Sequence, residues 1–136
     1  MILGLIHDCE EDGFMPKDLI AHLFGSFVAE GSEYLSKVYI QTDEAGIIIS
    51  KKRKSDKEYF ENLAKADIRI RHVKIADRID NLRSMESVWT KEKQKEYIEE
   101  TIRYILPLGV GSCGLSRQLR DKVKEWCKQN QELFVQ

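Results

Sequence analysis

The clearest pattern along the chain is an apolar stripe with helical spacing between residues 67 and 88. As a helix, this segment would carry four apolar residues on one side, namely Ile68, Ile75, Ile79 and Leu82. A second stripe of the same kind occupies residues 115–130 and consists of Leu115, Leu119, Val123, Trp126 and Cys127. Such stripes predict amphipathic helices that bury their apolar sides together, so we expect an all-α fold built as a helical bundle.

Turn and capping residues divide the chain into six or seven expected helices. The expected ranges are 1–12, 16–24, 26–37, 56–66, 67–88, 91–105 and 115–130. Pro16 is a favoured first-turn residue, and Gly25 is a typical C-terminal stop. Asp56 and Thr90 can act as N-caps. Pro107, with Gly109 and Gly111 after it, ends the sixth range.

Residues 38–50 do not follow a helical period. Two short β-branched runs, VYIQ and GIIIS, are separated by TDEA, and both a small hairpin and an irregular loop fit this segment. The run KKRKSDK that follows, at 51–57, is typical of a solvated surface.

The composition is that of an ordinary globular protein. The 136 residues suffice for a single domain, and 33% of them are charged while 42% are hydrophobic. The formal net charge of -1 gives no overall field that would select nucleic acid or an anionic membrane. The first apolar run is too short for a signal peptide, and Cys9, Cys113 and Cys127 show no CxxC spacing. We therefore expect reduced thiols and a cytoplasmic location.

The first group of chemically suggestive residues is HDCEED, at 7–12. His7 and Asp8 are adjacent at the expected end of a helix, and Glu11 and Asp12 follow one turn later. Imidazole and carboxylate groups together suit divalent cations such as Mn²⁺, Zn²⁺ or Fe²⁺. A helix end with surface acidic residues is the alternative interpretation of the same pattern.

The second group lies on the expected helix over 67–88, on the side opposite its apolar stripe. It consists of Lys74, Asp77, Arg78 and Asn81. Asp77 and Asn81 are four residues apart, so their side chains would be neighbours on a helix. A solvated charged face with simple ion pairs is the alternative here.

The two groups together resemble the hydrolase domain of RelA/SpoT-type proteins. HDxxED, followed by KxADRxxN on a long helix, occurs in that family in the same order. The segments LFGSFVAEGSEYLSK, ADIR, NLRS, ET at 100–101 and PLG at 107–109 also follow the family's order. The resemblance covers about residues 1–110 and implies an HD-domain helical bundle.

The resemblance also implies roles for individual residues. His7, Asp8 and Asp77 would be metal ligands, with Mn²⁺ as the expected cation. Glu11 and Asp12 would orient and deprotonate the attacking water.

Four further residues would bind the substrate, namely Lys74, Arg78, Asn81 and Ser84. The implied reaction removes the 3′-pyrophosphate of guanosine tetra- or pentaphosphate and leaves GDP or GTP. For Lys74 and Arg78, a structural ion pair is the alternative to a substrate contact.

The start of the chain differs from the family's pattern. Met1 falls within the helix that leads into HDxxED, whereas the family places a further metal-binding histidine upstream. We therefore expect residues 1–136 to form one N-terminally incomplete HD domain, with a homodimer covering exposed apolar residues such as Ile2 and Leu5. The alternatives are a non-catalytic domain that binds a nucleotide or a protein, and a phosphohydrolase for another nucleotide.

Overall fold

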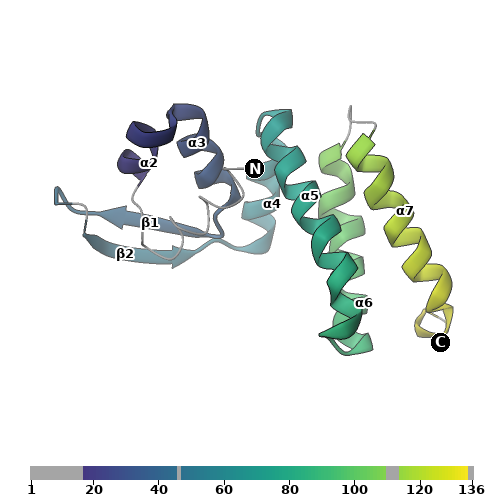
Figure 1. The fold of residues 1–136 in the computed structure, drawn as a ribbon. Coiled ribbons are helices and arrows are strands. Elements are labelled where there is room, and N and C mark those ends of the chain that lie inside the picture. Colours follow the sequence, from purple (N-terminus) through teal and green to yellow (C-terminus); the bar gives the residue numbers. More distant parts are fainter. Residues whose placement is uncertain (1–16, 46, 110–113, 135–136) are drawn as a thin grey trace. The chain divides into compact units, whose positions relative to one another are not determined.

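The computed structural model describes residues 17–45, 47–109 and 114–134. The chain divides into two compact units, Met1–Val73 and Lys74–Gln136, and each is described by itself. The described elements are mainly helices, with one two-stranded hairpin (Figure 1). This confirms the expected all-α helical class. The helix expected over 1–12 lies outside the described residues.

In the first unit, helix α2 (Lys17–Phe24) is separated from α3 (Ser26–Leu35) by a single residue. That residue is Gly25, whose φ of 95° lies in the region that favours glycine. Its amide donates to the carbonyl of Ala21 at 2.9 Å, so the expected stop at Gly25 is confirmed. Helix α3 ends two residues before the expected Lys37, because Ser36 adopts an extended conformation.

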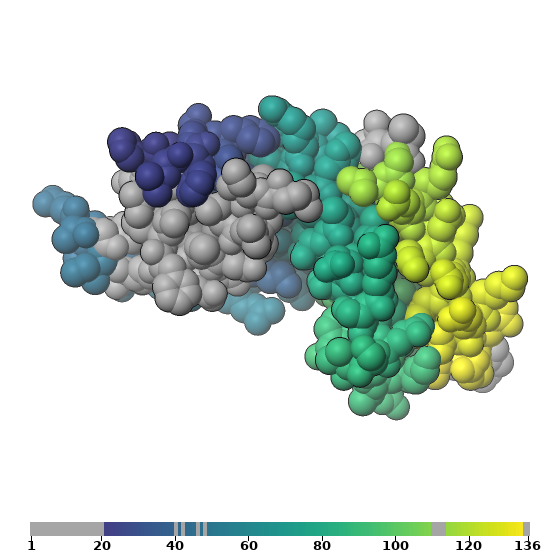
Figure 2. Space-filling view, in the orientation of Figure 1, coloured from purple at the N-terminus to yellow at the C-terminus, as the bar shows by residue number. Residues whose placement is uncertain are grey.

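The segment after α3 is a β-hairpin, which decides between the two structures that the sequence left open. Strand β1 (Val38–Thr42) pairs antiparallel with β2 (Ile48–Arg53), and the register shifts once, between Gln41 and Thr42. Strand β2 therefore includes part of the basic run, and Lys51, Lys52 and Arg53 are exposed as expected. The hairpin's tip, coloured blue, projects at the left edge of the space-filling view (Figure 2).

Helix α4 (Asp56–Ala64) begins one residue after its cap. The cap is Ser55, whose hydroxyl accepts from the amide of Glu58 at 3.2 Å, so the expected cap at Asp56 is wrong. Asp56 is instead the first helical residue, where a carboxylate is favourable near the N-terminal end of the helix dipole.

Helix α5 (Ile68–Ser84) is shorter than the expected range of 67–88 and continues as a 3₁₀-helical turn, Met85–Ser87. Asp67 precedes the helix and caps it, because its carboxylate accepts from the backbone amide of Arg69 at 2.9 Å. The Arg69 guanidinium also donates to this carboxylate. Together these bonds lower the pKa of Asp67 to about 2.

In the second unit, α5 from Lys74 onward lies beside α6 (Lys91–Glu100), and α6 lies beside α7 (Gly114–Gln129) (Figure 1). The expected cap of α6 is confirmed, since the Thr90 hydroxyl accepts from the amide of Lys93 at 3.3 Å.

The expected sixth helix does not continue regularly to Ile105. A wider π-helical turn, Thr101–Ile105, follows α6, and the amide of Leu106 donates to the carbonyl of Thr101 five residues earlier. A 3₁₀-helical turn, Leu106–Gly109, completes the segment and contains two of the expected helix breakers. The third, Gly111, lies outside the described residues.

Each unit buries its own apolar residues. In the first unit, Leu63, Ile70 and Phe60 are buried, and the buried Tyr59 hydroxyl donates to the carbonyl of Leu35 at 3.0 Å. In the second unit, the buried residues include the predicted stripe members Ile75, Ile79, Leu82, Leu119, Val123 and Trp126. The expected stripes are therefore confirmed at these positions, whereas Ile68, Leu115 and Cys127 are only partly buried.

The indole of Trp126 links α7 to α6. Its Nε1–H donates to Oε1 of the buried Gln94 at 3.0 Å, and Lys91 donates to Oδ1 of Asn130 at 2.8 Å. Within the described residues, no helix is long and apolar enough to cross a membrane.

Gly109 marks a close approach within the second unit. A Cβ added there would collide with the side chain of Ser116 on α7, whereas a Cβ at Gly114 would meet nothing. We expect Gly109→Ala to lower the free energy of unfolding by about 1–3 kcal/mol, because the buried side chain has little room to move. Urea denaturation measures this, with Gly114→Ala as the control, which should change stability by less than about 0.5 kcal/mol. Equal effects of the two variants would contradict the packing.

Candidate functional site

The structure describes about half of the predicted site. His7, Asp8, Glu11 and Asp12 lie outside the described residues. The remaining five residues all lie on α5, namely Lys74, Asp77, Arg78, Asn81 and Ser84. All five belong to the second unit, so their surroundings can be compared directly.

Asp77 is the described residue that is best placed to bind a cation. Its side chain is 48% exposed, so a ligand can reach the carboxylate. The ammonium of Lys74 lies 3.7 Å from Asp77 Oδ2, one turn earlier on the same helix, and the Lys74 side chain is only 10% exposed. Lys74 therefore places a positive charge beside the carboxylate while its apolar stem is covered.

Arg78 points into the protein and not toward solvent. It is 1% exposed, and its guanidinium donates to Oε1 of Glu100 at 2.8 Å and to Oγ1 of Thr101 at 3.3 Å. The guanidinium carbon also lies 4.0 Å from the centre of the Tyr97 ring. Of the two roles that the sequence left open for Arg78, these contacts favour the structural one. They also show that the polar side of α5 is not simply a solvated charged face.

Asn81 is half-buried beside the same tyrosine. Its Nδ2 donates to the hydroxyl of Tyr97 at 3.0 Å. Ser84 is exposed, and its hydroxyl donates to the backbone carbonyl of Asn81 at 3.3 Å. Asp77, Asn81 and Ser84 therefore form a strip along α5, which we call the α5 strip.

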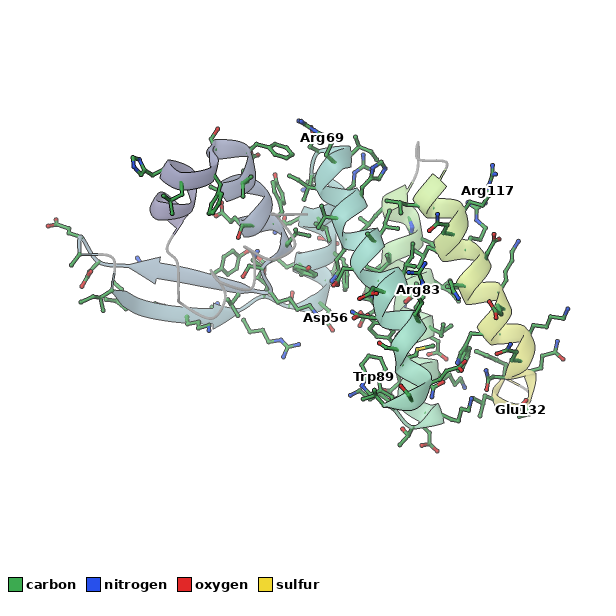
Figure 3. All side chains as sticks on the ribbon, viewed as in Figure 1. Asp56, Arg69, Arg83, Trp89, Arg117 and Glu132 are labelled. Atoms are coloured by element: carbon green, nitrogen blue, oxygen red, sulfur yellow. The ribbon has the colours of Figure 1, made fainter. Side chains whose placement is uncertain are left out.

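The Tyr97 ring is held on two sides. The Arg78 guanidinium stacks near it, and the Trp89 ring meets it edge-on, with 4.8 Å between centroids and an interplanar angle of 73°. Trp89 lies where the chain passes from α5 to α6 (Figure 3). Burial is the largest cause of the raised pKa of Tyr97.

Thr101 joins these contacts to the wide turn after α6. Its hydroxyl donates to the backbone carbonyl of Tyr97 at 2.7 Å while it accepts from Arg78. A threonine that bonds to the carbonyl four residues earlier competes with the helical backbone bond at that position. A π-helical turn of this kind is often found near a functional site.

Sequence reasoning missed Tyr97, and it noted Glu100 and Thr101 only as members of a family motif. Their spacing of three and four residues places them on one side of a helix. That spacing could have grouped them with each other. It could not have shown that this side of α6 faces Arg78 and Asn81, which are more than fifteen residues away in the chain.

The implied metal fits the described residues in one respect. Asp77 offers an accessible carboxylate oxygen, which is a suitable ligand for Mn²⁺. Among the described residues, no group of three histidine, cysteine or acidic side chains could hold a metal ion. Any further ligands that the family pattern implies would have to come from His7 and Asp8.

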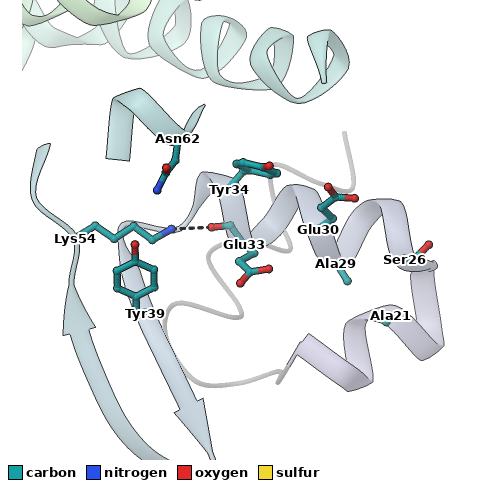
Figure 4. Close-up of a pocket in the computed structure, with 9 residues that line it drawn as sticks. All are labelled: Ala21, Ser26, Ala29, Glu30, Glu33, Tyr34, Tyr39, Lys54 and Asn62. Carbon is teal, nitrogen blue, oxygen red and sulfur yellow. Dashed lines mark hydrogen bonds between the residues drawn. The ribbon is translucent and has the colours of Figure 1, made fainter. Parts of the chain in front are cut away.

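A separate cavity of about 610 Å³ lies in the first unit (Figure 4). Lys54, from the end of the basic run, lies on its wall, donates to the carbonyl of Glu33 at 3.0 Å and approaches the Tyr39 ring. Lys54 is buried, so the expectation of a fully solvated basic run is wrong at this position. The described lining contains none of the predicted site residues, so this cavity is distinct from the α5 strip.

Comparison with known proteins identifies the family. A family model described as HD domain matches residues 1–108, so the chain belongs to the HD domain family. A rice (Oryza sativa) protein named probable GTP diphosphokinase RSH3, chloroplastic, is 33% identical over 111 residues, which are 77% of this chain and 15% of that protein. The expected resemblance to RelA/SpoT-type proteins is confirmed.

Two other relatives carry hydrolase names. A Mycoplasma genitalium protein named probable guanosine-3′,5′-bis(diphosphate) 3′-pyrophosphohydrolase is 31% identical, over 73% of this chain and 14% of that protein. The Drosophila melanogaster guanosine-3′,5′-bis(diphosphate) 3′-pyrophosphohydrolase MESH1 is 29% identical, over 71% of this chain and 51% of that protein. The chain thus spans about half or less of the length of these relatives.

The buried position of Arg78 leads to a stability prediction. Replacing it with methionine removes the positive charge and leaves Glu100 and Thr101 without their partner. We expect Arg78→Met to lower the free energy of unfolding by about 3 kcal/mol, measured by urea denaturation. Arg69→Met is the matched control, because the Arg69–Asp67 pair is exposed and should contribute less than about 1 kcal/mol. A smaller loss for Arg78→Met than for the control would contradict this assignment.

Proposed function

We propose that this chain hydrolyses the 3′-pyrophosphate of guanosine tetra- or pentaphosphate, with a divalent cation, to GDP or GTP and pyrophosphate. The observation that carries the proposal is the α5 strip, where an exposed carboxylate and an amide lie one turn apart within an HD domain. The names of the Mycoplasma and Drosophila relatives support hydrolysis, whereas the name of the rice relative refers to GTP diphosphokinase activity.

The proposed chemistry uses residues from both sequence motifs. His7, Asp8 and Asp77 would hold the cation, for which we propose Mn²⁺. A bound divalent cation lowers the pKa of water and offsets phosphate charge. Glu11 and Asp12 would position the attacking water and accept its proton. These roles of residues 7–12 rest on the resemblance in motif order.

Three residues of α5 would contact the substrate, namely Lys74, Asn81 and Ser84. Lys74 carries a positive charge next to Asp77 and would attract the polyphosphate. Asn81 and Ser84 would contact the nucleotide from the α5 strip. Arg78 would act indirectly, because its guanidinium is bonded to Glu100 and Thr101 and holds α6 against α5.

A second candidate function is a non-catalytic domain that binds a nucleotide. The Lys74–Asp77 ion pair favours it, because the ammonium already offsets the charge that a cation would otherwise neutralise. The two functions differ in metal content, since the proposed enzyme requires a cation at Asp77.

The decisive variant is Asp77→Asn, which keeps the size of the side chain and removes its charge. We expect Mn²⁺-dependent release of pyrophosphate from guanosine tetraphosphate to fall by more than the roughly 10–100-fold that is typical when an outer-shell residue is lost. The rate is measured by a coupled phosphate assay, with manganese content determined on the same protein.

Asp80→Asn is the matched control, because Asp80 is exposed on the same helix one turn later. It should leave both the rate and the metal content nearly unchanged. Release of pyrophosphate that does not depend on metal, or that is the same for both variants, would overturn the proposed function. Nucleotide binding without any hydrolysis would support the non-catalytic alternative.

A further inference from the structure

The half-buried hydroxyl of Tyr97 uses only part of its hydrogen-bonding capacity among the described residues. It accepts a hydrogen bond from Asn81 Nδ2, but among the described residues its own O–H proton has no acceptor. A tyrosine hydroxyl is protonated near pH 7, and burial raises the pKa of Tyr97 further. The group is therefore a neutral donor that has no acceptor within residues 17–45, 47–109 and 114–134, and it lies beside the α5 strip.

Asn81 offers the complementary group. Because its Nδ2 is directed at Tyr97, its carbonyl oxygen Oδ1 points elsewhere and has no partner among the described residues. This oxygen is also absent from the buried atoms that lack a hydrogen-bond partner, so it reaches solvent. In the part of the chain that the structure describes, Tyr97 and Asn81 thus present one unpaired donor and one unpaired acceptor next to each other.

The pair is held rigidly, which is a requirement for selective recognition. The Tyr97 ring is fixed between Arg78 and Trp89. Its backbone carbonyl is bonded to the Thr101 hydroxyl. The donor and acceptor therefore keep their relative positions before any ligand arrives, which lowers the entropy cost of binding.

We propose that Tyr97, together with Asn81, recognises the nucleoside part of the ligand and not its phosphates. A phosphate oxygen can accept from the Tyr97 hydroxyl but is repelled by the lone pairs of Asn81 Oδ1. A ribose hydroxyl, or a base edge with an N–H beside a carbonyl, can satisfy both groups at once. This inference rests on the proposed function in that it takes the α5 strip as the nucleotide site, and it adds Tyr97 as a specificity-determining residue.

The test compares two probes that share phosphate chemistry and differ in the nucleoside. Binding of GDP and of inorganic pyrophosphate to the full chain is measured by calorimetry with Mn²⁺ present. Tyr97→Phe keeps the ring against Arg78 and Trp89 and removes only the hydroxyl. We expect its dissociation constant for GDP to rise about tenfold, while its affinity for pyrophosphate stays within about twofold of that of the unaltered protein.

Tyr34→Phe is the matched control, because Tyr34 is another partly buried tyrosine and lies in the first unit. It should leave both affinities unchanged, and melting curves verify that each variant is folded. Asn81→Ala provides a second variant, which should also weaken GDP binding and spare pyrophosphate.

The outcomes separate the inference from the function on which it rests. If the unaltered protein binds neither GDP nor guanosine tetraphosphate, the proposed function and the inference both fail. If it binds GDP and Tyr97→Phe binds GDP equally well, only the inference fails. Equal losses for GDP and pyrophosphate would show that Tyr97 has a merely structural role, and would also overturn the inference.

Discussion

The buried guanidinium of Arg78 is the interaction on which the second unit most depends. Burying a charge costs several kcal/mol unless its hydrogen bonds are satisfied. Arg78 meets this requirement at its two terminal nitrogens, which donate to Thr101 and Glu100, while its buried Nε has no hydrogen-bond partner among the described residues. These two partners and the Tyr97 ring that the guanidinium stacks on all come from α6 or the turn after it. The side of α6 that faces α5 is therefore determined by a polar contact as well as by apolar burial.

This dependence links stability to the candidate site. Arg78 stacks on the same tyrosine whose hydroxyl orients Asn81. Arg78, which holds α5 and α6 together, is thus connected through Tyr97 to Asn81, which we expect to contact the nucleotide. Asp77 lies on the exposed side of α5 and is not part of this network among the described residues. Helix α5 therefore carries the buried Arg78 guanidinium on the side that faces α6 and the candidate metal ligand Asp77 on its exposed side.

Much of the fold could be predicted from the sequence, because it follows local signals. Gly25 and Thr90 mark helix boundaries through backbone conformation and capping, which depend on a few neighbouring residues. The cap at Ser55 was missed because serine and aspartate are both good caps and stand side by side. The π-helical turn was missed because it involves Thr101 bonding within a tertiary network that the local sequence does not reveal.

The candidate site was predictable only in part. Motif order identified Asp77 and Asn81, since the spacing of four residues has a direct meaning on a helix. The direction in which Arg78 points could not be predicted in the same way, because a charged residue on the polar side of a helix can face either solvent or a partner helix. The position of α6 beside α5 determines the orientation of Arg78, and it also places Tyr97 in contact with Arg78 and Asn81. The roles of His7, Asp8, Glu11 and Asp12 stay predictions, because these residues lie outside the described parts of the chain.

The wide turn at Thr101–Ile105 has a consequence for how this segment can change in evolution. A π-helical turn is equivalent to one residue inserted into an α-helix. Deleting one residue there would restore regular winding and would leave the two parts of the helix on either side of the turn facing as they do now. Regular winding of the full-length segment would instead rotate these parts by about 100° relative to each other. Without the deletion, regular winding would move Tyr97 and Ile105 off the side of the helix that they now share. Homologous chains without the wide turn should therefore be one residue shorter between the Thr90 cap and Pro107, and alignments should place a single gap there.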